Sequence, residues 1–254
     1  MLIVLVMFAL GLLLGFIGAG GAGVVIAVLT VVFGIPIHTA LGTSLSAMIF
    51  TMISGAYSHF REGNVVVKNG AAIGIFGAIG AFIGAQIAAG LPAKELKWMT
   101  ACMLLLSALL LWLRIFFADK GIFSRSGSEA GPTGISFWLT ASGLGLVTGV
   151  LSGTFGIGAT PFIQIGLLIF FHMSIHQSAG TTMLVILPIA LLGGLGYLTA
   201  GHLDVLLLFK VTIGLIVGAY IGAKFTRRLD PFILKISMVA VPVFGGLLLL
   251  LFGR

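Results

Sequence analysis

Charged residues are scarce in this chain of 254 residues: 7% are Asp, Glu, Lys or Arg, whereas 59% are hydrophobic. In soluble domains roughly a quarter of all residues are charged, so water is not the main solvent of this protein. Apolar stretches of about the 20 residues that a spanning helix needs recur from Leu2 to Phe252, with short polar interruptions. The sequence therefore predicts an all-α polytopic membrane protein.

Other scarcities exclude whole classes of function. The single cysteine, Cys102, permits neither an intrachain disulfide nor a cysteine-based metal site. All six acids fall in or beside predicted loops, so no carboxylate is available inside the bilayer as a cation ligand or proton relay. Neither an H-E-x-x-H motif nor a pair of apposed aspartates is present, which argues against an intramembrane enzyme, a bound metal and a cofactor. Lys and Arg lie singly or in small groups without interleaved aromatics, so the net charge of +7 does not indicate nucleic-acid binding.

Short polar stretches divide the chain into two sets of four apolar segments: 2–34, 38–60, 69–90 and 96–117, then 136–171, 176–199, 204–224 and 232–252. A shift of 138 residues aligns the sets without a gap, matching Gly11, Gly15, Gly18, Gly20, His38, Gly42, Thr43, Gly55, Gly63, Gly80 and Gly84 with Gly149, Gly153, Gly156, Gly158, His176, Gly180, Thr181, Gly193, Gly201, Gly218 and Gly222. We expect one membrane repeat at 1–117, a polar linker at 118–135 and a second repeat at 136–254.

The first segment of each repeat is too long for one crossing and too short for two full ones. Each contains a glycine-rich interruption, at 18–23 in one half and at 153–158, followed by Pro161, in the other. Such clusters break a helix, and breaks at matching positions of two halves are typical of a transporter binding site. Gly18, Gly20 and Gly23 also match the dinucleotide fingerprint G-x-G-x-x-G. The first acid in the chain is Glu62, so the required acidic partner is absent.

The positive-inside rule favours inverted repeats. If each broken segment crosses once, the 13 Lys and Arg residues divide almost evenly between the faces. If each enters and returns as a re-entrant hairpin, nine share one face (Arg61, Lys68, Arg114, Lys120, Arg125, Lys224, Arg227, Arg228 and Lys235) and four the other (Lys94, Lys97, Lys210 and Arg254). The second arrangement places the nine in the cytoplasm and both termini outside.

Two paired motifs are candidates for an anion site. Broken half-helices present free backbone N–H groups and positive dipole ends, which assigns substrate contacts to Gly18, Gly20, Gly21, Gly156 and Gly158. The second motif offers hydroxyls and exposed backbone, which adds Gly42, Thr43, Ser44, Gly180, Thr181 and Thr182; Gln164 is a lone amide on the pathway. His38 and His176 are candidates for proton coupling. Close packing, helix capping and structural hydrogen bonding are the competing interpretations of all these residues.

No Lys or Arg is expected in the middle of a span, so dipoles and hydroxyls would hold the anion. Lys210 lies about one turn into its segment and either extends to the interface or lines an anion vestibule. The spacings Gly80-x-x-x-Gly84 and Gly214-x-x-x-Gly218-x-x-x-Gly222 predict faces for close helix packing.

These motifs resemble the TauE/SafE sulfite exporter family. The resemblance rests on Gly18-Ala19-Gly20-Gly21, Phe33-Gly34-Ile35-Pro36, Ala40-Leu41-Gly42-Thr43-Ser44-Leu45 and Gly63-Asn64-Val65, with echoes at 156–158, 178–182 and 201–204, and spans nearly the whole chain. It implies a prokaryotic inner-membrane transporter that exports sulfite, sulfoacetate or related organosulfonates. Pro161 stands where the first half has Gly23, and Ala159 where it has Gly21, so the two half-sites need not contribute equally.

The sequence therefore predicts a secondary transporter whose two halves hold a small sulfur oxyanion between their broken helices. An anion channel and a non-transporting membrane scaffold are the alternatives. The expected partners are the anion and the lipid bilayer, and assembly into a homodimer stays open.

Overall fold

The computed structural model describes residues 1–17, 22–117, 131–226 and 231–252 of the chain. The described residues form helices joined by short turns and contain no strand, which confirms the all-α prediction. The helices are α1 (Leu2–Ile17), α2 (Ala22–Val31), α3 (Ile37–Arg61), α4 (Val67–Gly90), α5 (Ala93–Phe117), α6 (Gly134–Phe155), α7 (Thr160–Phe170), α8 (Ile175–Thr199), α9 (Val205–Thr226) and α10 (Pro231–Phe252).

The helix boundaries follow the offset of 138 residues. α8 begins and ends 138 residues after α3, and α7 begins 138 residues after α2. The first apolar segment of each half is broken, as predicted, since α1 ends at Ile17 before α2 begins at Ala22, and α6 ends at Phe155 before α7 begins at Thr160. The unit that recurs is therefore five helices long, not four segments.

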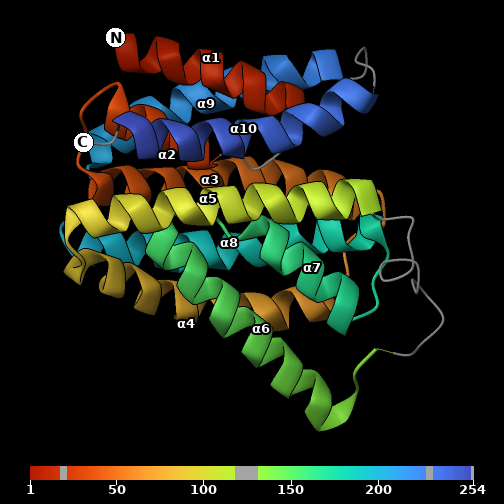
Figure 1. Cartoon of the computed structure of the whole chain (residues 1–254). Helices are drawn as coiled ribbons and strands as arrows, with labels where there is room; N and C mark the ends of the chain where they lie inside the picture. The colour runs from red at the N-terminus through yellow and green to blue at the C-terminus, as the bar shows by residue number, and fades with distance from the viewer. Residues whose placement is uncertain (18–21, 118–130, 227–230, 253–254) are drawn as a thin grey trace.

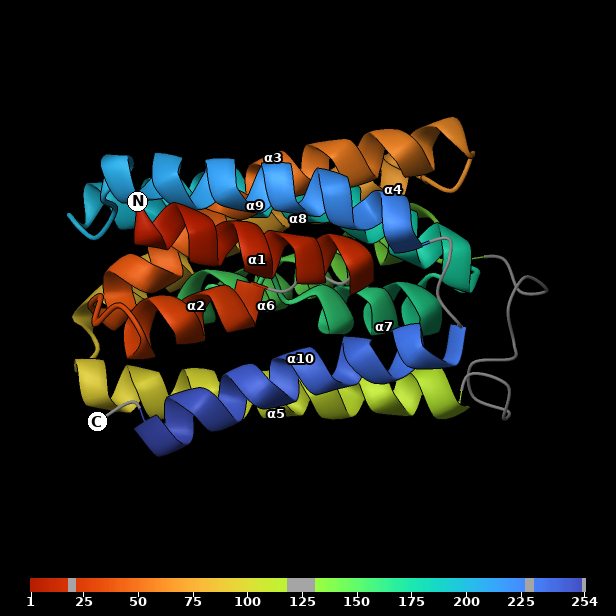
Figure 2. The same ribbon diagram turned by 90° about the horizontal axis from the view of Figure 1, so that it is seen from above.

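Helix length separates spanning helices from half-helices. α3, α4, α5, α6, α8 and α9 are long and apolar enough to cross a membrane, which makes the chain a multi-pass membrane protein. α2 and α7, of 10 and 11 residues, reach about 15 Å, or half of a hydrocarbon core of roughly 30 Å. The helices lie alongside one another, and the start of α1 and the end of α10 lie at the same end of the bundle (Figures 1 and 2).

Each half packs its first helix against the fourth helix of the other half. α1 lies along α9 and α6 lies along α4. Glycines make the contact: a Cβ on Gly80 would lie 2.5 Å from the carbonyl oxygen of Leu146, and one on Gly214 would lie 2.8 Å from that of Val4. Gly84 and Gly218 have equally close neighbours, which confirms the predicted packing faces at these four glycines. Dispersion between close backbones therefore joins the two halves.

Gly149 on α6 tests the importance of this close approach. A Cβ there would overlap the carbonyl group of Gly77 on α4, so Gly149→Ala has to push the two helices apart. We expect a loss of about 1–3 kcal/mol, the usual range for overpacking, and a lower midpoint of thermal unfolding in detergent. Gly143→Ala, on the same helix but facing open space, is the matched control and should be neutral or slightly stabilising. Equal midpoints for the two variants would contradict the proposed contact.

Candidate functional site

A cavity of about 470 Å³ lies at the N-termini of α2 and α7, the helices that follow the two breaks. The first turn of α2 lines it through Ala22 and Gly23, and the first turn of α7 lines it through Thr160 and Pro161. α3, α5, α9 and α10 supply most of the remaining wall. Because a helix N-terminus carries free N–H groups and a partial positive charge, two such ends at one cavity favour a negatively charged occupant.

The turn before α7 requires backbone conformations that most residues avoid. Gly156 and Gly158 have φ of 65° and 69°, and Ala159 between them and α7 has φ of 46°. The hydroxyl of Tyr197 donates hydrogen bonds to the carbonyl oxygens of Gly153 and Thr154, at 2.8 and 3.3 Å, at the end of α6. These bonds satisfy carbonyls that the helix break leaves free and fix the start of α7 beside the cavity.

Among the described residues that line the cavity, one guanidinium carries a full positive charge. Arg114, in the last turn of α5, donates a hydrogen bond to the side-chain oxygen of Gln164 on α7, and both residues line the cavity. Ser44 lines it too and donates to the carbonyl of Ala22 at 3.0 Å. Ser107 adds a buried hydroxyl that has no hydrogen-bond partner in the described structure. No Asp or Glu occurs among the described lining residues, so the cavity suits an anion.

Two of the predicted substrate contacts, Ser44 and Gln164, line this cavity. Gly156 and Gly158 form the turn that leads into its wall, and a substrate contact at any of the four stays a prediction. The predicted contacts at Gly18, Gly20 and Gly21 lie outside the described residues. Arg114 was missed, because the sequence places it near the end of a span and does not show that its side chain meets α7. Its position two turns after Ser107, on one face of α5, is the signal that points to it.

Apart from Ser44, the residues of the second predicted motif do not line the cavity. Thr181 accepts a hydrogen bond from the backbone N–H of Val66 at 3.1 Å, and Thr182 donates to the carbonyl of Ser178 at 2.7 Å. Thr43 is fully buried, and its hydroxyl has no hydrogen-bond partner among the described residues. Gly42 and Gly180 are sites of close packing, since a Cβ would lie 2.8 Å from Tyr197 and 2.5 Å from Asn64, respectively. These residues position helices, and a direct substrate contact at any of them stays a prediction.

The two predicted histidines have different environments although they occupy equivalent positions. The Nε2 atom of His38 lies 3.0 Å from the carbonyl oxygen of Leu91. The ring of His38 stacks on that of His202, with ring centroids 4.8 Å apart. His176, by contrast, is exposed. Burial, together with the charge of His38, lowers the pKa of His202 from its ordinary value. His38 and His202 lie at the end of the bundle where α3 and α9 begin.

Known proteins are similar to this chain over most of its length. Residues 3–249 match the family model of the sulfite exporter TauE/SafE. The probable membrane transporter protein YdhB of Bacillus subtilis is 53% identical over 250 residues, which cover 98% of this chain and 100% of that protein. The probable membrane transporter protein MJ0441 of Methanocaldococcus jannaschii is 28% identical over 266 residues, which cover 98% and 95%. No solved structure matches the chain.

The lowered pKa of His202 predicts that the stability of the fold depends on pH. Because the pKa of His202 is lowered in the folded protein, the unfolded chain binds the proton more tightly, and stability is lost as pH falls through the ordinary imidazole range near about 6.5. We expect the midpoint of thermal unfolding to fall on acidification, and to fall less in His202→Asn, which introduces the residue type of the equivalent position, Asn64. The exposed His176 provides the control, since His176→Asn should keep the wild-type profile. An unchanged profile in His202→Asn would contradict this assignment.

Proposed function

Because the chain belongs to the TauE/SafE sulfite exporter family, we propose that it is a secondary transporter that moves a small sulfur-containing anion out across the prokaryotic inner membrane. The substrate class is sulfite, sulfoacetate or a related organosulfonate. The observation that carries this proposal is the cavity between the broken helices. It combines Arg114, hydroxyls and two half-helix N-termini, and no acid lies among its described lining residues.

The chemistry of a sulfonate or sulfite group matches this lining. Its oxygens accept hydrogen bonds only, and the cavity offers donors from the Arg114 guanidinium, the hydroxyls of Thr160 and Ser107, and the backbone at the start of α7. Thr160 and Ser107 have buried hydroxyls without partners in the described structure, so they can donate to a ligand without breaking an existing bond. Arg114 and Gln164 form the polar pair that an arriving anion would join.

The inverted arrangement of the halves is part of the proposal. The start of α3 (Pro36 and Thr39) shares a pocket with Gly201, just after the end of α8, whereas Val66, just after α3, bonds to Thr181 near the start of α8. α3 and α8 are equivalent helices, so opposite directions support an inverted repeat. The nine-to-four distribution of Lys and Arg supports the same arrangement, with both termini outside.

Arg114 is the residue whose replacement tests the proposed function. We expect Arg114→Gln to raise the half-saturation concentration for sulfoacetate or sulfite at least about tenfold, because one charge-assisted contact contributes roughly 1.5–3 kcal/mol. Arg114→Lys should retain part of the activity, since it keeps the charge and loses the planar donor pair. The measurement is uptake into liposomes that contain purified protein, with taurine, thiosulfate and sulfate as comparison solutes.

Arg61→Gln is the matched control, because Arg61 is an exposed arginine at the end of α3 and does not line the cavity. It should transport like the wild type. Saturable uptake with counterflow distinguishes a carrier from the alternative of an anion channel. If the wild type moved none of these anions, the scaffold alternative would replace the proposed function, and normal transport by Arg114→Gln would remove Arg114 from the site.

A further inference from the structure

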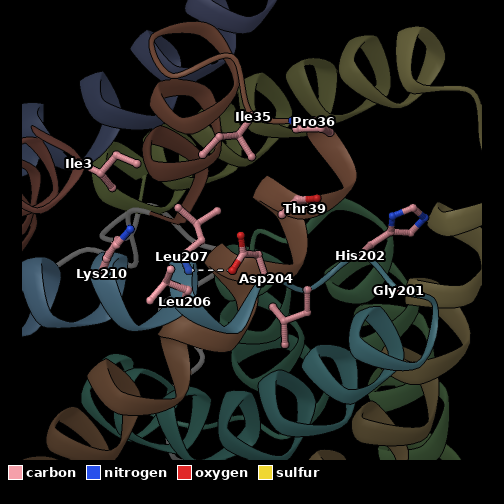
Figure 3. Close-up of a pocket in the computed structure, with 11 residues that line it drawn as sticks. Ile3, Ile35, Pro36, Thr39, Gly201, His202, Asp204, Leu206, Leu207 and Lys210 are labelled. Carbon is pink, nitrogen blue, oxygen red and sulfur yellow. Dashed lines mark hydrogen bonds between the residues drawn. The ribbon is translucent and has the colours of Figure 1, made fainter. Parts of the chain in front are cut away.

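A second pocket, of about 430 Å³, lies at the end of the bundle where α3 and α9 begin (Figure 3). Ile3 of α1, Thr39 of α3 and Lys210 of α9 line it, together with the 201–204 turn. Neither Arg114 nor Gln164 lines it, and Lys210 does not line the cavity between the broken helices, which we call the central cavity. The second pocket is therefore a separate concavity, which we call the outer pocket, and its described lining contains one Lys, one Asp and one His.

The two concavities lie along the same three helices. On α9, Leu207 lines the outer pocket and Leu215 lines the central cavity, a separation of about 12 Å at 1.5 Å per residue. Val211, one turn from each, is completely buried. On α3, Thr39 lines the outer pocket, Ser44 lines the central cavity, and the fully buried Thr43 lies between them.

The same order holds on α1, where Ile3 lines the outer pocket and Gly11 lines the central cavity. Met7 lies between these two positions and is completely buried. The buried residues Met7, Thr43 and Val211 therefore lie between the outer pocket and the central cavity, which are about 12 Å apart along α1 and α9 and about 7.5 Å apart along α3. The two concavities are consecutive along one line through the bundle.

The charges of the outer pocket are not paired with one another. One carboxylate oxygen of Asp204 accepts a hydrogen bond from the backbone N–H of Leu207 at 3.0 Å, so Asp204 caps the start of α9 (Figure 3). Lys210 is half-buried and has no carboxylate within 4 Å in the described part of the chain. A half-buried ammonium group without a counter-ion is a suitable contact for an oxyanion, and the hydroxyl of Thr39 lines the same pocket.

We propose that the outer pocket is a second binding site for the transported anion, at the outer mouth of a pathway along α1, α3 and α9, with Lys210 as its charged contact. The inference rests on the proposed function, because it assumes that the central cavity carries the same anion. Its basis in the outer pocket is independent: Lys210 has no counter-ion in the described structure, and the two concavities share three helices with only a few buried residues between them. In this pathway an exported anion leaves Arg114, passes Thr43 and Val211, and reaches Lys210 before it enters the outer solution.

Thiol labelling in intact cells tests the site. Cys102→Ala first removes the native thiol, and Thr39→Cys then places one thiol in the outer pocket. A membrane-impermeant maleimide is added outside, with and without sulfoacetate; sulfite is unsuitable because it reacts with maleimides. We expect labelling from outside and about fivefold slower labelling with saturating sulfoacetate, a protection that Lys210→Gln abolishes.

Lys94→Gln is the matched control, since it removes a lysine at the same end of the bundle without altering the pocket lining, and it should keep full protection. If Thr39→Cys does not fold, Leu206→Cys, exposed in the same pocket, replaces it. Labelling that sulfoacetate does not slow, or protection that survives Lys210→Gln, overturns the outer site even when wild-type liposomes transport sulfoacetate. Labelling found only in inside-out vesicles overturns its outer location. Protection that depends on Lys210, in a protein whose liposomes move no anion, supports the site and refutes the proposed transport.

Discussion

A helix that stops inside a membrane leaves backbone groups without partners, and hydrocarbon offers none. The end of α6 meets this constraint through the hydroxyl of Tyr197, which donates to the carbonyls of Gly153 and Thr154. The N–H groups at the start of α7 have no comparable partner side chain in the described part of the chain, and residues of this first turn line the central cavity. The same break that would destabilise the fold in lipid therefore creates donors where an anion can use them.

Two such breaks can be enclosed only if other helices approach them closely. Packing between the halves provides this close approach, because the first helix of each half lies on the fourth helix of the other half. α6 lies on α4 and α1 lies on α9 through glycine contacts, so the helix that precedes each break is fixed by the opposite half. Gly42 allows Tyr197 to reach the end of α6, because a side chain at position 42 would occupy the space of the tyrosine. Much of the glycine in this chain therefore serves the close packing that encloses the breaks.

Local signals explain what the sequence could predict. Glycine spacing, segment length and the 138-residue offset predicted the helical class, both breaks and the packing faces. They also pointed to Gln164, which lies one turn after the second break, and to Ser44, which belongs to the paired motif near the start of the second segment. Arg114 and Tyr197 were not identified, since their roles depend on which distant helix their long side chains meet. The same dependence on tertiary contacts explains the bond that Thr181 accepts from the distant Val66, whereas Thr182 bonds back to Ser178 within its own helix.

The two halves pack differently although their helices are equivalent. α4 is closed against α8, where Cβ atoms on Gly74 and Gly77 would lie 2.8 and 2.7 Å from Pro188 and Ile189. The equivalent pair, α9 and α3, bounds the cavity instead, and Thr43 lacks the backbone partner that its counterpart Thr181 finds in Val66. One molecule thus contains both a closed and an open arrangement of the same helix pair. Secondary transporters expose one binding site to the two sides of the membrane in turn. For the transporter proposed here, a state that faces the other side needs no new kind of packing, because exchanging the two arrangements closes α9 on α3 and opens α4 from α8.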